Sequence, residues 1–237
     1  MSFGSPGTLA SDWESRKAFV QAPWQAPPEV IIEDREVAVD SHNNILMGDS
    51  RERLVIVYTD GIGIEGRIGA AAIVDLDDQH AHSQMGNDDM STVYAAELHA
   101  IEMALALVLE STEPWAEQAK NGLVIFADSQ AALKALRRPK MPSGQVYLEG
   151  CLNLIRRLAA RGIRAELRWI TAHQGVIGNE IVDKHAKEEA REPEGPQNPD
   201  NRHIRLAAAV KRRVRYEAKI EWERRGRRKR PSHRRDA

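Results

Sequence analysis

The chain has 237 residues, enough for one or at most two domains, with 42% hydrophobic and 29% charged residues. Its single cysteine, Cys151, excludes a disulfide framework, and no N-terminal apolar stretch resembles a signal peptide or spans a bilayer, so we expect an intracellular protein of the nucleus or cytoplasm that is not secreted and contacts no membrane. The formal net charge of −1 conceals an acidic body and a basic tail.

The N-terminal segment, residues 1–50, contains four prolines and shows no sustained apolar period of either kind. Without such a period, no helix or strand is predicted. We therefore interpret residues 1–50 as a proline-containing tether.

Three strands are predicted next, near residues 53–60, 67–76 and 79–86, as an antiparallel meander. The first ends with the continuous apolar run from Leu54 to Thr59, which is typical of a strand covered on both faces. Asp60 is predicted to mark the C-terminal end of this strand, with Gly61, Gly63 and Gly66 supplying a flexible turn after it.

A helix over 91–111 and a strand over 122–128 follow. Apolar residues recur at steps of three and four in the helix, and Glu97 falls inside that stripe. The strand ends in Asp128, just as the first strand ends in Asp60. Because a helix between two buried strands makes a crossover, we expect these strands to be parallel neighbours or near-neighbours whose carboxyl ends, with Glu97, face one crevice.

The remaining elements alternate between helix and strand: helix 129–138, helix 143–161, strand 163–170 and helix 178–191. Gly162 is a plausible cap after the helix that ends at Arg161. The pattern predicts an α/β fold with a five-stranded mixed sheet, in which an antiparallel meander precedes parallel strands and helices flank the sheet.

Four carboxylates stand out from this pattern: Asp60, Glu97, Asp128 and Asp183. Each alone has another explanation, because aspartate after a strand is often a turn former or a helix N-cap. Ionised carboxylates that share a partly buried site repel one another and would have to take up protons, unless a cation neutralises them. Oxygen ligands without a cysteine cluster favour Mg²⁺ or Mn²⁺ over Zn²⁺.

Four sequence blocks carry a family resemblance: Tyr58-Thr59-Asp60-Gly61, Ala96-Glu97-Leu98, Ala127-Asp128-Ser129-Gln130 and the run from His173 to Asp183. In this order and spacing they resemble ribonuclease H type 1, over a predicted catalytic domain of residues 51–192. The resemblance implies the ribonuclease H-like fold and an endonuclease that hydrolyses the RNA strand of RNA/DNA hybrids. It implies two Mg²⁺ ions, which Mn²⁺ can replace, that clamp the attacking water and the leaving 3′ oxygen, giving 3′-hydroxyl and 5′-phosphate ends.

The resemblance also assigns roles to single residues. Asp60 would bridge both metal ions, Glu97 and Asp128 would complete the site, and Asp183 would serve one ion from the far side. His173 precedes a glycine-rich loop that would swing its imidazole toward the scissile phosphate, although a surface or capping histidine is the alternative.

Substrate contacts follow from two further positions. Gln130 matches a family position that touches bases in the minor groove, and Thr92 matches one that holds a phosphate of the DNA strand, with helix capping as the rival role for Thr92. The chain departs from the cellular pattern at Ile62, Val93 and Tyr94, where many cellular members carry polar residues. These departures concern efficiency and hybrid specificity, and leave all four carboxylates in place.

Residues 91–98 and 23–28 look like the ribonuclease H segment of fungal LINE-type (non-LTR) retrotransposon polyproteins, where it follows a reverse transcriptase. The resemblance implies a detached or truncated copy, or a host gene derived from one. A reverse-transcriptase partner is therefore left open, and a monomer is expected. A catalytically weak or inactive remnant that still binds nucleic acid is the alternative function.

The C-terminal tail, residues 193–237, is predicted to be partly helical and partly disordered. From Arg202 onward it holds 15 Lys/Arg and 4 Asp/Glu, about +11, which leaves about −12 for the preceding residues of a chain with 34 basic and 35 acidic side chains. We expect the tail to attract nucleic-acid phosphates, with a solvated extension or a nuclear localisation signal as alternatives.

Overall fold

The computed structural model describes residues 13–14, 17, 20–22, 25–49, 51–75, 79–139, 143–172, 176–192 and 204–228, with side chains to Arg224. A short 3₁₀ turn, Arg51–Arg53, precedes β2. The helices and strands, in chain order, are β1 Glu29–Ile31, α1 Arg35–Met47, β2 Val55–Ile64, β3 Arg67–Val74, β4 His80–Asn87, α2 Val93–Glu110, α3 Pro114–Gln118, β5 Leu123–Ala127, α4 Gln130–Arg137, α5 Gln145–Ala160, β6 Ala165–Trp169, α6 Ile177–Arg191 and α7 Ala207–Arg228.

A single mixed sheet with the strand order β1-β6-β5-β2-β3-β4 organises the fold. The hairpins β2–β3 and β3–β4 are antiparallel, while β2, β5, β6 and β1 pair in parallel. The predicted meander and the parallel pairing of β2 with β5 are therefore confirmed. The five-strand expectation was one strand short, because β1 adds a sixth strand beside β6.

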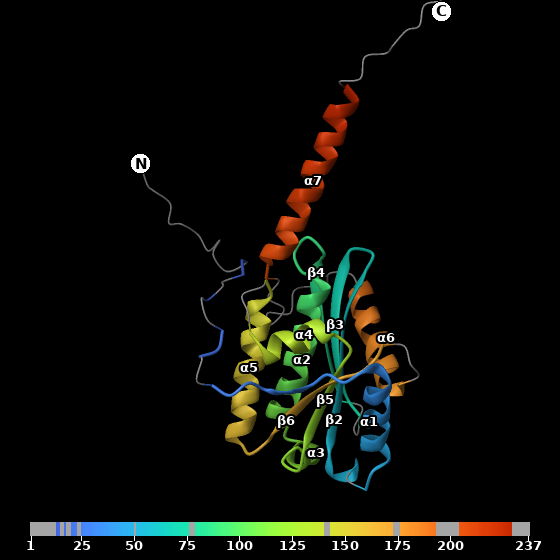
Figure 1. Ribbon diagram of the computed structural model, residues 1–237, viewed down its shortest axis with the longest axis vertical. Coiled ribbons are helices and arrows are strands. Elements are labelled where there is room, and N and C mark those ends of the chain that lie inside the picture. Colours follow the sequence, from blue (N-terminus) through green and yellow to red (C-terminus); the bar gives the residue numbers. More distant parts are fainter. Residues whose placement is uncertain are drawn as a thin grey trace, which may run out of the picture.

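Helices cover both faces of the sheet (Figure 1). One hydrophobic cluster joins the sheet to α2, α4 and α5, with Leu98, Ile101, Leu133 and Leu148 fully buried in it. The second cluster lies on the opposite face, against α6 and part of α1, around Tyr58 and Phe126. Alternate residues of β2 supply the two clusters, as expected for a strand buried on both faces.

The interpretation of residues 1–50 as a plain tether is wrong for residues 29–47, which form β1 and α1. His42 of α1 is buried, its Nε2 lies 2.8 Å from the Tyr58 hydroxyl, and its ring packs edge-on against Phe126. A three-residue strand is too short to show a period, and α1 buries only Ala38 and His42, so neither element has an amphipathic signature.

The prediction that Asp60 ends its strand is also wrong, because β2 continues through Gly61 and Gly63 to Ile64. Beyond its pairing with β5, this part of β2 is held by β3. The reversal occurs instead at Glu65 and Gly66, whose φ values of 51° and 77° suit a tight hairpin. The predicted cap at Gly162 does have a positive φ, of 80°.

The last helix, α7, rises from the body as a separate rod (Figure 1). Among its described residues, α7 is anchored in the core only at its start, through the buried Ala209 in its first turn and Leu206 just before it. Among the described helices, none combines the length and apolar character needed to cross a membrane.

Candidate metal centre

The parallel pairing of β2 with β5 places two aspartates side by side. Its last register pair is Thr59 with Ala127, and Asp60 and Asp128 are the next residue of each chain. Since carboxyl ends of neighbouring parallel strands meet at one edge, both side chains arrive at the same point. The sequence prediction that these residues share an edge holds, although β2 runs on past it.

Glu97 joins them because α2 packs unusually close to β2. A Cβ atom on Gly61 would lie 2.3 Å from the backbone nitrogen of Glu97 and 2.5 Å from the carbonyl carbon of Ala96. Only glycine permits this approach of helix and strand backbones. Gly61 therefore acts through the absence of a side chain, not as the flexible turn that the sequence suggested.

Helix α6 brings Asp183 near Asp60 from the other face of the sheet, but Asp183 lies outside the group of three carboxylates whose oxygens are within 4.8 Å of one another. Two glycines allow the contact: a Cβ on Gly178 would lie 2.2 Å from the Tyr58 ring, and one on Gly69 would lie 2.5 Å from the carbonyl oxygen of Ala186. The side chain of Asp183 lies close enough to Asp60 to raise the pKa of Asp60, and it forms an ion pair with Lys187 one turn later.

The carboxylate cluster consists of Asp60, Glu97 and Asp128, each of which offers an oxygen within 4.8 Å of the others. Asp60 is only 6% exposed and Glu97 7%, while Asp128 is half-buried. Among the described residues, nothing hydrogen-bonds to the buried Oε2 of Glu97. Buried acceptors are normally satisfied, so an oxygen in this state fits a site that accepts a ligand.

Burial and mutual repulsion perturb the titration of these groups. Desolvation, followed by the charges of Asp128 and Asp183, raises the pKa of Asp60 from 3.8 to about 7. Desolvation and the charges of Asp128 and Asp60 raise the pKa of Glu97 well above its usual range. The backbone N–H of Gly61, which faces both carboxylates, opposes the rise in their pKa. A divalent cation with oxygen ligands would relieve this repulsion, and the donor set suits a hard ion.

Comparison with known proteins agrees with this geometry. Residues 52–191, more than half of the chain, match the family model described as RNase H. The chain belongs to the RNase H family. Its fold is accordingly the expected ribonuclease H-like one, with one additional strand.

Two solved structures resemble this RNase H chain. A Prototype Foamy Virus protease–reverse transcriptase mutant has 16% identity and a TM-score of 0.45, over 59% of this chain and 21% of that chain. LC11-RNase H1 in complex with an RNA/DNA hybrid has 14% identity and a TM-score of 0.41, over 56% of this chain and 97% of that chain. This chain thus spans about a fifth of the viral one. No curated protein sequence matches significantly.

The remaining predicted site residues of this RNase H domain lie near the cluster or outside the described part. Thr92 is the N-cap of α2, and its hydroxyl accepts from the Ala95 N–H at 3.2 Å, which confirms the capping role. Gln130 opens α4, two residues after Asp128, and its Oε1 accepts from Lys134 at 2.8 Å. His173 lies outside the described residues.

The three departures from the cellular pattern do not enter the carboxylate cluster. Ile62 is half-buried against the second hydrophobic cluster, and Tyr94 packs against the first. Val93, 43% exposed, begins α2 near Gly63. The substitutions therefore alter the surroundings of the centre without changing its ligand set.

Sequence reasoning missed Lys187, the cation beside Asp183. The spacing of four residues on a predicted helix was a signal that could have identified it, because residues i and i+4 are neighbours on one helix face. Lys187 offsets the charge of Asp183.

Proposed function

We propose that this protein is an endonuclease that hydrolyses the RNA strand of RNA/DNA hybrids and leaves 3′-hydroxyl and 5′-phosphate ends. The observation that carries the proposal is the convergence of Asp60, Glu97 and Asp128, with Asp183 near Asp60, in a chain of the RNase H family. Four carboxylates, carried by β2, by α2, by α6 and by the residue after β5, have no evident structural purpose where they gather, because their repulsion opposes folding.

The same four residues are the proposed ligands of two Mg²⁺ ions, with Mn²⁺ as a possible substitute. When bound, the ions would activate water and stabilise the charge that develops on the phosphodiester. Asp60, the most buried of the four, is proposed to contact both ions, which fits its position between the other three carboxylates. The raised pKa of Asp60 and of Glu97 means that a neighbouring cation would favour the ionised form of both carboxylates.

We propose that three residues outside the ligand set, His173, Thr92 and Gln130, bind the substrate or transfer a proton. His173 would carry a proton to or from the reacting phosphate. Thr92 sits at the N-terminus of α2, where its backbone environment favours an anion, in keeping with a phosphate contact of the DNA strand. Gln130 begins α4, two residues after Asp128, and would touch bases in the minor groove of the hybrid.

We further propose that the chain derives from a LINE-type retrotransposon and acts inside the cell, in the nucleus or cytoplasm. The support is the resemblance of residues 91–98 and 23–28 to such polyproteins and the single, buried cysteine. A reverse-transcriptase partner would be found by copurification with the full chain.

The test is cleavage of an end-labelled RNA/DNA hybrid by the purified full chain in Mg²⁺, beside single-stranded RNA and duplex RNA of the same sequence. Asp128→Asn should abolish cleavage. Asp34→Asn is the matched control, since Asp34 is an exposed aspartate before α1 whose side chain makes no capping bond. No cleavage by the parent chain, with binding retained, would establish the nucleic-acid-binding remnant instead.

A further inference from the structure

Helix α7 is a 22-residue rod, about 33 Å long, that leaves the body beside the N-terminus of α2 (Figure 1). All described residues from Lys211 to Arg224 are exposed. An isolated helix of mainly charged residues gains nothing from core burial, so its conformation and direction depend on how its first turns are fixed.

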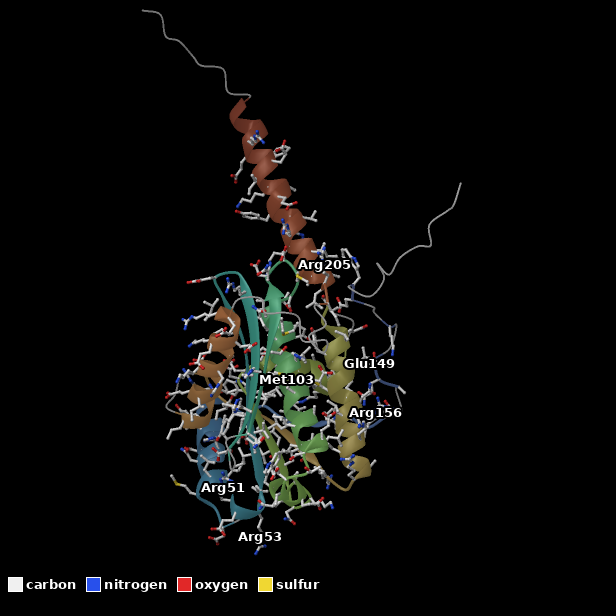
Figure 2. All side chains as sticks on the ribbon, turned by 180° about the vertical axis from the view of Figure 1, so that it is seen from behind. Arg51, Arg53, Met103, Glu149, Arg156 and Arg205 are labelled. Carbon is white, nitrogen blue, oxygen red and sulfur yellow. The ribbon has the colours of Figure 1, made fainter. Side chains whose placement is uncertain are left out.

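Several contacts fix the root of α7 to the domain. The Leu206 N–H donates to the carbonyl oxygen of Met90 at 2.8 Å, and the Ala207 N–H donates to Glu14 at 3.2 Å. Arg212 and Arg213 form ion pairs with Asp88 and Asp89 in the turn before α2. Figure 2 marks the root by Arg205, at the opposite end of the body from Arg51 and Arg53.

Beyond the root, three cations form a stripe along one face. Lys211, Arg215 and Lys219 are spaced by four residues, so they lie within a narrow sector of the helix surface, and Trp222 falls in the same sector. Trp222 is 79% exposed. Within the described part of the chain, none of the three cations makes an ion pair or hydrogen bond, unlike Arg212 and Arg213. We call these four residues the α7 stripe.

A second copy of the chain does not suit this helix. A coiled coil needs one apolar seam with a period of 3.5 residues. The large exposed apolar side chains of α7 instead point to different sides, because Val214 and Trp222 lie away from Tyr216 and Ile220 on a helix of 100° per residue. Unpaired cations with an interleaved tryptophan match a phosphate backbone with stackable bases or sugars.

We infer that the α7 stripe binds the phosphate backbone of a nucleic-acid duplex that extends from the metal centre. The inference rests on the proposed function for the choice of an RNA/DNA hybrid as that duplex. The root of α7 contacts Met90, two residues before Thr92, the N-cap of α2. Glu97 lies about 7 Å beyond Thr92 along the axis of α2. A duplex over the carboxylate cluster therefore passes the base of the rod. Its stripe, about 17 Å from Lys211 to Trp222, can follow one strand.

The experiment measures hybrid affinity against salt concentration by fluorescence anisotropy, in an Asp128→Asn background that prevents cutting. The stripe variant replaces Lys211, Arg215 and Lys219 by Gln. The matched control replaces Arg53, Lys120 and Arg164 by Gln, three exposed cations that precede the amino ends of β2, β5 and β6. Both variants lose three positive charges, so a difference between them reports position and not net charge.

The stripe variant should bind at least about tenfold more weakly at 0.1 M salt and lower the salt slope by about 2 to 3, whereas the control should change little. Trp222→Ala should weaken binding with an unchanged slope. Equal loss in both triple variants overturns the inference, and so does a stripe variant that only converts a dimer to a monomer in sedimentation. Cleavage by the parent chain is measured separately. If binding depends on the stripe but the parent chain does not cleave, the proposed function alone is overturned. If the parent chain cleaves but the stripe variant binds as well as the parent, this inference alone is overturned.

Discussion

Replacing Asp128 by Asn should stabilise the metal-free protein, although it removes a proposed metal ligand. Two charged oxygens at 4.8 Å, the upper limit of the separations in the cluster, would repel by about 3.5 kcal/mol at an effective dielectric constant of about 20. Asp128 is half-buried, so water screens its part of the repulsion. We expect a gain of about 1–2 kcal/mol in the free energy of unfolding at pH 8.

The gain should depend on pH, with a sign that follows from the raised pKa of Asp60. Because the folded protein holds this proton more tightly than the unfolded chain, the metal-free protein loses stability from Asp60 as pH rises from 3.8 to about 7. Near pH 4 Asp60 and Glu97 are neutral, so Asp128→Asn should have little effect there. The difference between the two proteins should therefore grow between pH 4 and pH 8.

Urea unfolding in EDTA and in Mg²⁺ measures both effects. At a Mg²⁺ concentration 100-fold above the dissociation constant, the parent chain should gain about 2.7 kcal/mol, and Asp128→Asn should gain much less. Asp34→Asn, with an exposed aspartate, should behave like the parent chain. The reasoning is refuted if Asp128→Asn is no more stable than the parent chain in EDTA at pH 8, or if Mg²⁺ stabilises both equally.

Three further predictions concern how the elements are held. Gly61→Ala should cost about 2–3 kcal/mol in urea unfolding, because its Cβ would lie 2.3 Å from the backbone nitrogen of Glu97; a neutral result would mean that α2 can retreat. Glu14→Ala should cost about 1–2 kcal/mol and speed proteolysis of α7, since Glu14 accepts from N–H groups at the starts of α5 and α7; unchanged digestion would contradict this. Tyr58→Phe should cost about 1–3 kcal/mol in thermal unfolding by leaving the buried Nε2 of His42 unpaired, and an unchanged melting temperature would argue against that contact.

The parallel core was predictable because its signals are local and strong. The run from Leu54 to Thr59 and the run from Leu123 to Ala127 are apolar without interruption, and each precedes an aspartate. Continuous apolar strands separated by an amphipathic helix imply a parallel crossover, which by itself brings the two strand ends together. The position of Glu97 followed from the period of α2.

The parts that were not predictable depend on contacts between distant segments. The strand β1 exists because three residues pair with β6, and nothing within those three residues requires it. In α1 the buried polar group His42 meets Tyr58, and a histidine does not register as apolar in a periodicity count. The strand β2 continues past Asp60 because β3 pairs with the residues that follow it, and no residue near Asp60 indicates this pairing in the sequence.

The cations of α7 form two groups with different roles: those paired with acidic residues of the body, and those of the α7 stripe. Arg212 and Arg213 are neutralised by Asp88 and Asp89, so they fix the rod and offer little attraction to a phosphate. The stripe cations lie progressively farther from the acidic body. At physiological ionic strength, dissolved ions screen the interaction between exposed charges more than about 8 Å apart. Lys219 stands eight residues beyond Lys211, about 12 Å along the axis, and thus past the reach of the acidic turn at the root. Attraction of a duplex therefore rests mainly on the distal half of the stripe, where the repulsion of the body no longer counts.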